Sequence, residues 1–486
     1  MCWRRLRVQL NLKTAVGSPK STQALGAPGK SEKPLITNKV TTSFSDSPCT
    51  PIAYASFSRP TAVSRLKKNI RRGLTAATCT LLGAPLTGQS VQAADEGWAV
   101  DSSVLIYSEA DNRVSAIEPV IEFNKEIHED EFVDIKLVLD TLSGASPNGA
   151  SPTNKVQTFT RPSGNGSYQI AAGDLPLDDT FRDTRGAVSV NWDKPLSRLV
   201  RRQLGVAISQ EFDYTSLSVN GLMSRDFNHR NTTLQGGVSV AADDVRPIGG
   251  IPVAFASMVA PGNSQPRDGS SDTKTTLDLL LGVTQVLGHD TIGQINYTFS
   301  DSSGYLTDPF KILSVVDGAT GETRDLVYEN RPDQRVKHSF YAEIKHFLSD
   351  DVINASFRYY TDDWGIDSQT ADLSYRWKLG EKSYLQPRFR WYQQTAADFY
   401  HHSLSDAAPL PAEASADPRL GDFSATTVGL KFGYKLPVGG ELSLRGEYYQ
   451  QSGDDHPSDA IGIQKQFDLF PETKAIILQV GYSVKW

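Results

Sequence analysis

The chain has 486 residues, a formal net charge of −7 and three cysteines, Cys2, Cys49 and Cys79. Residues 1–93 hold 14 basic and 2 acidic residues, which leaves 35 basic and 54 acidic residues after Ala93 and a net charge of −19 there. Phosphate backbones attract concentrated positive charge, so this composition argues against a nucleic-acid partner. The absence of cysteine after Ala93 excludes a disulfide framework or a thiolate metal site in that part.

The segment 64–94 has the pattern of a secretory signal. Its apolar stretch, 74–86, is too short to span a bilayer as a helix, and small residues around Ala93 suit a cleavage site. Its charged region holds Lys67, Lys68, Arg71 and Arg72. We therefore interpret residues 64–93 as a signal peptide that is cleaved near Ala93.

Residues 1–63 are rich in Ser, Thr, Pro and Lys and show no periodic apolar pattern. Because they precede a secretory signal, we interpret them as the product of a start site placed too far upstream, with Val63 or Leu66 as the alternative start. A disordered leader or transit peptide is the competing interpretation. The folded part is expected over residues 94–486.

From Trp98 onward, short segments alternate between apolar and polar residues, with almost no helical periodicity. A strand points successive side chains to opposite faces, so each segment has one bulky apolar face and one polar or charged face. A transmembrane barrel needs this pattern because lipid surrounds it and water fills it. In chain order, the clearest segments are 133–140, 353–360, 371–379, 427–434, 442–449 and 475–486.

The final segment places Tyr482 and Trp486 on its apolar face. A soluble sandwich rarely ends by exposing such aromatic residues, although a soluble periplasmic β-protein remains the alternative. In a barrel, we expect these two residues to form the C-terminal assembly signal, with outer-membrane lipid and the barrel-assembly machinery as partners.

The connections between segments fall into two alternating sets, and we count about sixteen strands. One set is tight, and the other contains every long connection: 141–183, 242–273, 301–335, 395–422 and 452–471. Short periplasmic turns and long extracellular loops are typical of outer-membrane barrels. The sequence therefore predicts an all-β, transmembrane antiparallel β-barrel, with bulges or bends at Pro119 and Pro387.

Four segments carry a family resemblance: 113–124 (RVSAIEPVIEFN), 139–149 (LDTLSGASPNG), 184–190 and 213–231 (DYTSLSVNGLMSRDFNHRN). They resemble an uncharacterised family of bacterial proteins that are predicted to be secreted, β-rich outer-membrane proteins. SGASPNG, and DYTSLSVN with SRDFN, are the most specific parts. The resemblance covers the chain after the signal and implies a barrel in a Gram-negative outer membrane, but it implies no activity or substrate.

Charged residues on the predicted inner face form two sets. The acidic set lies on strands two to four and comprises Glu118, Glu122, Asp134, Asp140 and Asp193. The basic set lies on strands eleven to thirteen and comprises Arg358, Arg376, Lys378, Arg388 and Arg390. In a ring of about sixteen strands these sets lie roughly opposite each other, which would place a transverse field across a water-filled pore.

This arrangement favours a porin-like channel for small hydrophilic or anionic solutes. Two alternatives stay open: a wall of ion pairs that only stiffens the barrel, and a structural or assembly barrel that anchors or sheathes an unknown partner protein. The segment 143–152 (SGASPNGASP) is a candidate constriction or plug within the lumen.

No enzymatic site is expected. His401, His402 and Ser403 are the closest histidine–serine grouping, and they lie in a loop instead of on the barrel wall. Aspartates cluster in two loops, but their spacing matches no defined calcium loop, and solvated loops are the simpler interpretation. These aspartates are Asp178, Asp179, Asp183, Asp454, Asp455 and Asp459. We accordingly expect no cofactor and no metal.

Overall fold

The structure, a computed structural model, describes residues 97–437 and 439–485. The interpretations of residues 1–63 as an extension and 64–93 as a signal peptide cleaved near Ala93 lie outside these residues, as does the assembly role of Trp486. Within the described residues, no helix is long and apolar enough to cross a membrane.

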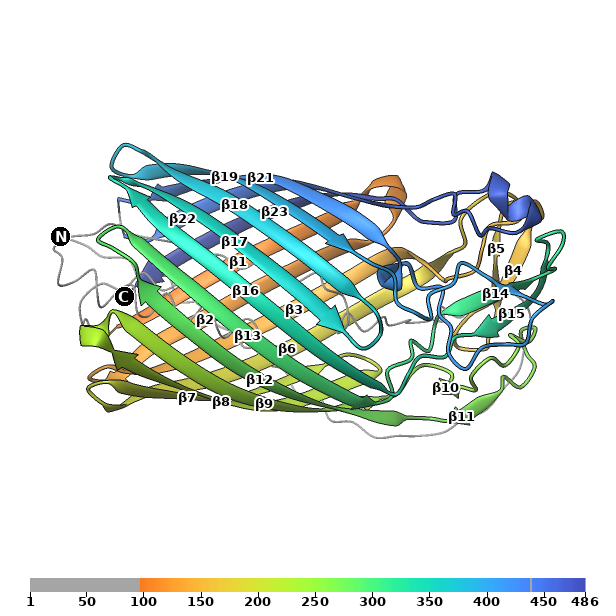
Figure 1. Cartoon of the computed structure of the whole chain (residues 1–486), viewed down its shortest axis with the longest axis horizontal. Helices are drawn as coiled ribbons and strands as arrows, with labels where there is room; N and C mark the ends of the chain where they lie inside the picture. Colours follow the sequence, from red (N-terminus) through yellow and green to blue (C-terminus); the bar gives the residue numbers. More distant parts are fainter. Residues whose placement is uncertain (1–96, 438, 486) are drawn as a thin grey trace, which may run out of the picture. The chain divides into compact units, whose positions relative to one another are not determined.

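Sixteen antiparallel strands form one closed barrel, in which each strand pairs with its neighbours in chain order (Figure 1). This confirms the predicted fold class and the strand number. The strands are β1 (Trp98–Glu109), β2 (Ser115–His128), β3 (Glu131–Pro147), β6 (Leu177–Ser197), β7 (Val200–Gln210), β8 (Tyr214–Phe227), β9 (Thr232–Val245), β12 (Asp272–Val286), β13 (Thr291–Gly304), β16 (Gln334–Leu348), β17 (Asp351–Asp362), β18 (Asp367–Leu379), β19 (Ser383–Gln394), β21 (Phe423–Lys435), β22 (Glu441–Gly453) and β23 (Thr473–Lys485).

The first and last strands close the ring. β1 pairs with β23 in an unbroken antiparallel register that runs from Ala99 opposite Lys485 to Glu109 opposite Ala475. A closed ladder gives the backbone N–H and C=O groups of every strand a partner within the sheet, which the hydrocarbon core of a membrane demands. No sheet edge of the barrel therefore faces lipid.

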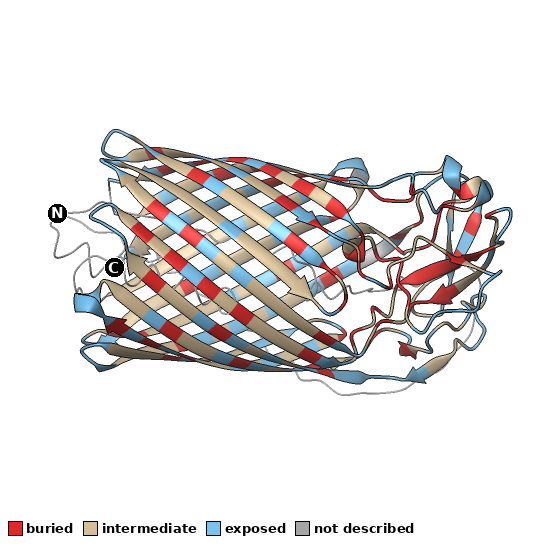
Figure 2. Cartoon of the chain, viewed as in Figure 1, coloured by how far each residue is buried: buried red, intermediate tan, exposed pale blue. Residues whose placement is uncertain are grey.

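Bulky apolar residues of the strands are exposed, whereas the alternate residues are mostly polar. Figure 2 shows that exposed and less exposed residues alternate along the strands. On β23, Ile476 is 56% exposed and Val480 is 50% exposed, while Ala475 of the opposite parity is only 2% exposed. This inverted pattern is the lipid-facing belt of a transmembrane barrel. Trp377, Phe432, Tyr434 and Tyr482 are exposed toward one end of this belt, where an aromatic girdle is expected.

The two ends of the barrel differ in their connections. At the end that we call the turn end, seven connections of two to five residues join the strands, and β23 ends at Lys485 on the same side. The turn before β22 uses Gly439 and Gly440 at φ of 92° and 90°, a backbone region that favours glycine. At the other end, the loop end, lie all five long loops: 148–176, 246–271, 305–333, 395–422 and 454–472.

The long loops contain short elements of their own. Their strands are β4 (Gln157–Thr160), β5 (Ser167–Ile170), β10 (Ile251–Pro252), β11 (Arg267–Gly269), β14 (Ile312–Val316), β15 (Thr323–Tyr328) and β20 (Leu404–Ser405). The 3-10 helices of the described residues are η3 (Ala110–Asn112), η4 (Asn228–Arg230), η5 (Pro418–Leu420) and η6 (Gly462–Gln466).

Pro119 and Pro387 each interrupt the ladder on one side. β2 and β3 pair at Ile117 and again at Val120, and β18 and β19 pair at Ser374 and again at Trp377, with the register unchanged across both gaps. The interruption follows because proline has no N–H to donate. Of the predicted bulges or bends, a bulge is wrong at both positions because no residue is inserted, and a bend stays a prediction.

We predict that a charged residue lowers the free energy of unfolding more on the lipid-facing side of β23 than on its inner side. Val480→Arg places a charge in the lipid-facing belt and is expected to destabilise the barrel by about 2–4 kcal/mol. Gln479→Arg, on the inner face, is the matched control and should cost far less. Reversible unfolding of both variants from lipid vesicles measures the difference, and equal costs would contradict a lipid-facing belt.

Candidate functional site

The predicted acidic set lies on β2, β3 and β6, the second to fourth strands of the ring, on the parity opposite the exposed apolar residues. Arginines from neighbouring strands contact two of its members. Asp140 forms an ion pair with Arg185, and Asp193 accepts from the Arg201 guanidinium at 2.6 Å. Asp134 accepts a hydrogen bond from the Asn124 side chain.

Glu118 and Glu122 form no ion pair within the described part of the chain. Glu122 is 7% exposed and one of its carboxyl oxygens has no hydrogen-bond partner. Lys136 lies directly opposite Glu122 in the register, which makes it the nearest cationic position on the adjacent strand. Burial without an ion pair distinguishes Glu122 from Asp140 and Asp193, which are paired with arginine.

The predicted basic set lies on β17, β18 and β19, the eleventh to thirteenth strands of the ring. Its members do not form one group. Lys378 reaches Asp350 in the turn before β17, so it lies at the turn end. Arg388 bridges Asp372 on the adjacent strand and Glu447 on β22, the latter at 3.2 Å.

The other three arginines, Arg358, Arg376 and Arg390, have no carboxylate within ion-pair distance among residues 97–437 and 439–485. Arg358 lies 5.7 Å from the centre of the Tyr341 ring. Arg376 stacks 3.6 Å from the centre of the Tyr384 ring, and its Nη1 atom is buried without a hydrogen-bond partner. These contacts hold the side chains without neutralising their charge.

Tyr384 is itself held flat against the wall. Its hydroxyl donates to Glu441 at 2.8 Å, and its ring covers Gly433, where an added Cβ would come within 2.1 Å of the ring. Gly433 thus provides the space that lets Tyr384 support Arg376.

The basic wall extends beyond the predicted set to Lys431 and Arg445, which lie opposite each other on β21 and β22. The sequence pattern placed both residues on the polar parity, but the predicted basic set was limited to strands eleven to thirteen and did not include them. Arg445 contacts Glu447 at 3.2 Å. The wall therefore combines paired and unpaired cations over five adjacent strands.

Above the loop end, the long loops pack into a common layer (Figure 1). β14 pairs with β15 and, in parallel, with β20, so the loops 305–333 and 395–422 share one sheet. Buried apolar residues from these loops form one cluster, and Ala150 and Phe159 of loop 148–176 join Ile312 and Tyr328 in another. The segment 143–152 continues β3 to Pro147 and then packs in this layer through Ala150, and its role as a constriction or plug stays a prediction.

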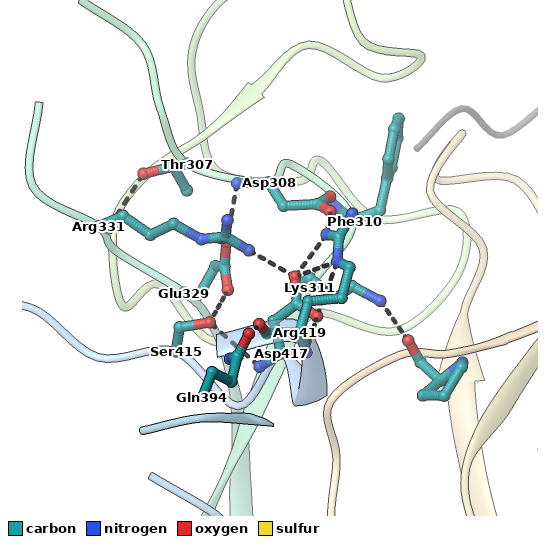
Figure 3. A network of polar contacts seen from close by, with 11 residues as sticks. Thr307, Asp308, Phe310, Lys311, Glu329, Arg331, Gln394, Ser415, Asp417 and Arg419 are labelled. Carbon is teal, nitrogen blue, oxygen red and sulfur yellow. Dashed lines mark hydrogen bonds and ion pairs between the residues drawn. The ribbon is translucent and has the colours of Figure 1, made fainter. Parts of the chain in front are cut away.

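A network of buried charges joins the same loops (Figure 3). Arg331 contacts Glu329 at 2.6 Å and Asp417 at 2.8 Å, and all three residues are at most 6% exposed. Arg419 contacts Asp417 and reaches Asp308 at 2.7 Å. Lys311 donates to the backbone carbonyl of Pro147, which ties the network to the end of β3.

Two of the three carboxyls of this network, those of Asp417 and Glu329, differ in their ionisation. Burial opposes ionisation of Asp417, but Arg419, Lys311 and Arg331 outweigh it and hold the pKa of this carboxyl far below its ordinary value of 3.8. Burial raises the pKa of Glu329, and Arg331 only partly offsets this effect. Asp417 is consequently the anion on which the network depends.

Comparison with known proteins identifies the family. Residues 72–484 match the family model described as Protein of unknown function (DUF3570). The chain belongs to DUF3570. This confirms the resemblance to an uncharacterised family, while the comparison with curated proteins gave no match.

Solved structures similar to this DUF3570 chain include other barrels. The ferric enterobactin receptor PfeA of Pseudomonas aeruginosa is 11% identical with a TM-score of 0.39, and the match covers 80% of this chain and 60% of the receptor. OmpT of Vibrio cholerae, lacking loop L8, is 10% identical with a TM-score of 0.34, with 81% and 100% covered. A bacterial polysaccharide outer membrane secretin is 8% identical with a TM-score of 0.39, with 81% and 99% covered. The chain thus spans about 60% of the length of the receptor.

The closed ring, the apolar belt and the difference between its two ends are the architecture of outer-membrane barrels. This DUF3570 chain is therefore an outer-membrane type of β-barrel.

The histidine–serine grouping of the sequence lies in the loop layer. With Leu410 and Ile461, among other residues, it lines a cavity of about 320 Å³ between loops 395–422 and 454–472. Ser403 Oγ donates to the Gln464 side chain at 2.9 Å, and His402 Nδ1 lies 3.4 Å from the Tyr400 hydroxyl. Burial lowers the pKa of His402, although Asp459 opposes this. These contacts tie Ser403 to a neighbouring loop, and the absence of enzymatic activity stays a prediction.

One group of side chains in the described ranges is compact enough to hold a metal ion: Asp455, His456 and Asp468, whose ligand atoms lie within 4.8 Å of one another. All three are exposed. His456 Nδ1 lies 3.0 Å from Asp455 and Nε2 lies 3.6 Å from Asp468, and the Asp455 hydrogen bond is the main reason that the pKa of His456 is raised. Exposed ion pairs explain these contacts, and the expectation of no metal stays a prediction.

We predict that Asp417→Asn loosens the loop layer. The change leaves Arg331 and Arg419 short of a counter-charge, and losing one partner of a buried ion pair costs about 3–5 kcal/mol. Amides of loops 305–333 and 395–422 should exchange hydrogen faster, while amides of the barrel strands keep their protection. Because the pKa of Asp417 is lowered, its stabilisation is present above pH 3.8 and is lost as the pH falls below it.

Asp406→Asn is the control for this measurement. Asp406 is exposed in the same loop and accepts a hydrogen bond from the Gly318 N–H. If both variants change exchange equally, the buried network does not hold the layer together.

Proposed function

We propose that this protein is a channel of the Gram-negative outer membrane that lets small hydrophilic solutes pass and prefers anions. The turn end faces the periplasm and the loop layer faces outward, as in other barrels of this type. The small solute is the ligand, and no cofactor takes part.

A single observation carries the proposal: on one side of the lumen, three inward-facing arginines have no ion-pair partner in the part of the chain that the structure describes. They are Arg358, Arg376 and Arg390. On the other side, Arg185 and Arg201 pair with Asp140 and Asp193, whereas Glu118 and Glu122 form no ion pair among the described residues. Uncompensated lumen charge sets ion preference, because low-dielectric walls concentrate the field within the pore. The three arginines give the basic wall a local surplus of positive charge, which favours anions along that wall.

The loop layer favours a second candidate, a barrel that anchors a partner protein. Its shared sheet and buried clusters present a preformed surface instead of separate mobile loops. A preformed surface lowers the ordering cost of binding. This candidate predicts a stoichiometric partner in preparations from native membranes and no conductance after reconstitution.

We predict that the purified protein gives stepwise currents in planar bilayers, with a reversal potential in a KCl gradient that indicates anion preference. Changing Arg358, Arg376 and Arg390 together to Glu should reverse the sign of that potential, because the basic wall becomes acidic. The measurement is the reversal potential of each protein at low salt, where screening is weakest.

The matched control reverses three loop residues, Lys155, Arg246 and Arg324, whose side chains are 68%, 69% and 53% exposed. It changes the net charge equally but leaves the lumen intact. An unchanged potential in the lumen variant, or the same shift in both variants, would reject the proposed selectivity. Absence of current from the folded protein would reject the channel and leave the partner-binding candidate.

A further inference from the structure

Two of the unpaired arginines lie close together on the inner wall. Tyr341, Arg358, Thr370 and Tyr392 are register partners in one row across β16, β17, β18 and β19. Arg390 precedes Tyr392 by two residues on the same face of β19, so it occupies the next row. Arg358 and Arg390 therefore flank Thr370 from two sides.

Within residues 97–437 and 439–485, Arg358 forms no ion pair with a carboxylate. The groups within electrostatic range of its guanidinium are Tyr341, Tyr392 and the second cation, Arg390. Asp372 lies directly opposite Arg390 in the register, but its carboxylate accepts two hydrogen bonds from Arg388. Two like charges thus share a patch of wall without a counter-charge of their own.

Such a pair is costly unless an anion occupies the space between the charges. A guanidinium presents a planar fork of N–H donors that matches the oxygens of phosphate or carboxylate. Where Arg358 rests near the Tyr341 ring, the contact orients the group but uses none of its N–H donors. The guanidinium groups of Arg358 and Arg390 therefore both keep N–H donors that can bind a ligand.

We propose that Arg358 and Arg390 form a binding site for a phosphate group, either inorganic phosphate or a phosphate monoester, on the lumen wall. This site rests on the proposed channel function and names its solute class. Phosphate carries between one and two negative charges near neutral pH, which suits two uncompensated cations better than a monoanion does. Thr370, between the two arginines, supplies a hydroxyl donor at the same position.

Charge-conserving substitutions separate this site from general anion preference. In Arg358→Lys with Arg390→Lys, the charges stay but the two planar forks are lost. Isothermal titration of the detergent-solubilised full chain with inorganic phosphate, at constant ionic strength, should show at least tenfold weaker binding for this variant. Acetate should bind the unaltered protein at least tenfold more weakly than phosphate does.

Arg376→Lys is the matched control, since Arg376 is also unpaired but stacks on Tyr384 on another part of the wall. It should leave phosphate binding unchanged. Each variant is first shown to be folded by heat-modifiable migration on a gel. Undiminished phosphate binding in the double variant, equal loss in Arg376→Lys, or acetate binding as tight as phosphate would overturn the site.

Reversal potentials of the same proteins in planar bilayers separate the proposal of an anion channel from the proposal of a phosphate site. Because lysine retains the charge, the double variant should keep the reversal potential of the unaltered protein. Phosphate binding without anion preference would reject the channel proposal and retain the site. Anion preference without phosphate binding would reject the phosphate site and retain the channel proposal.

Discussion

The structure depends on the pairing of β1 with β23. Without it, two strands would present unpaired N–H and C=O groups to hydrocarbon, where no water can satisfy them. Closure also fixes which residues face inward, because residues paired across neighbouring strands lie on the same face of the sheet. The exposed Val480 and the polar Gln479 beside it are therefore consequences of a ring, and so is the placement of charges on the lumen wall.

Period-two alternation made the architecture predictable from the sequence, because a strand has only two faces and lipid demands an apolar one. The connections between the alternating segments set the count of about sixteen strands. Because tight and long connections alternate, they also predicted that the short turns lie at one end of the barrel and the long loops at the other. The inward parity of residues such as Arg358 and Glu118 followed from the same pattern.

The partners of those residues could not be predicted. Arg185 and Arg201 neutralise acids from neighbouring strands, and that relation depends on register, which one strand's pattern does not contain. The loop layer was missed for a related reason. Its clusters join residues from loops far apart in sequence, so no local periodicity marks Phe159 or Asp417 as buried.

Because of the loop layer, the two ends of the barrel differ in the contacts that join neighbouring hairpins. At the loop end, β20 pairs with β14, and the ion pair between Arg331 and Asp417 joins loop 305–333 to loop 395–422. At the turn end, each hairpin closes through its own short turn. Separate hairpins are therefore joined at the loop end by contacts between their loops, in addition to the strand pairing that runs around the whole barrel.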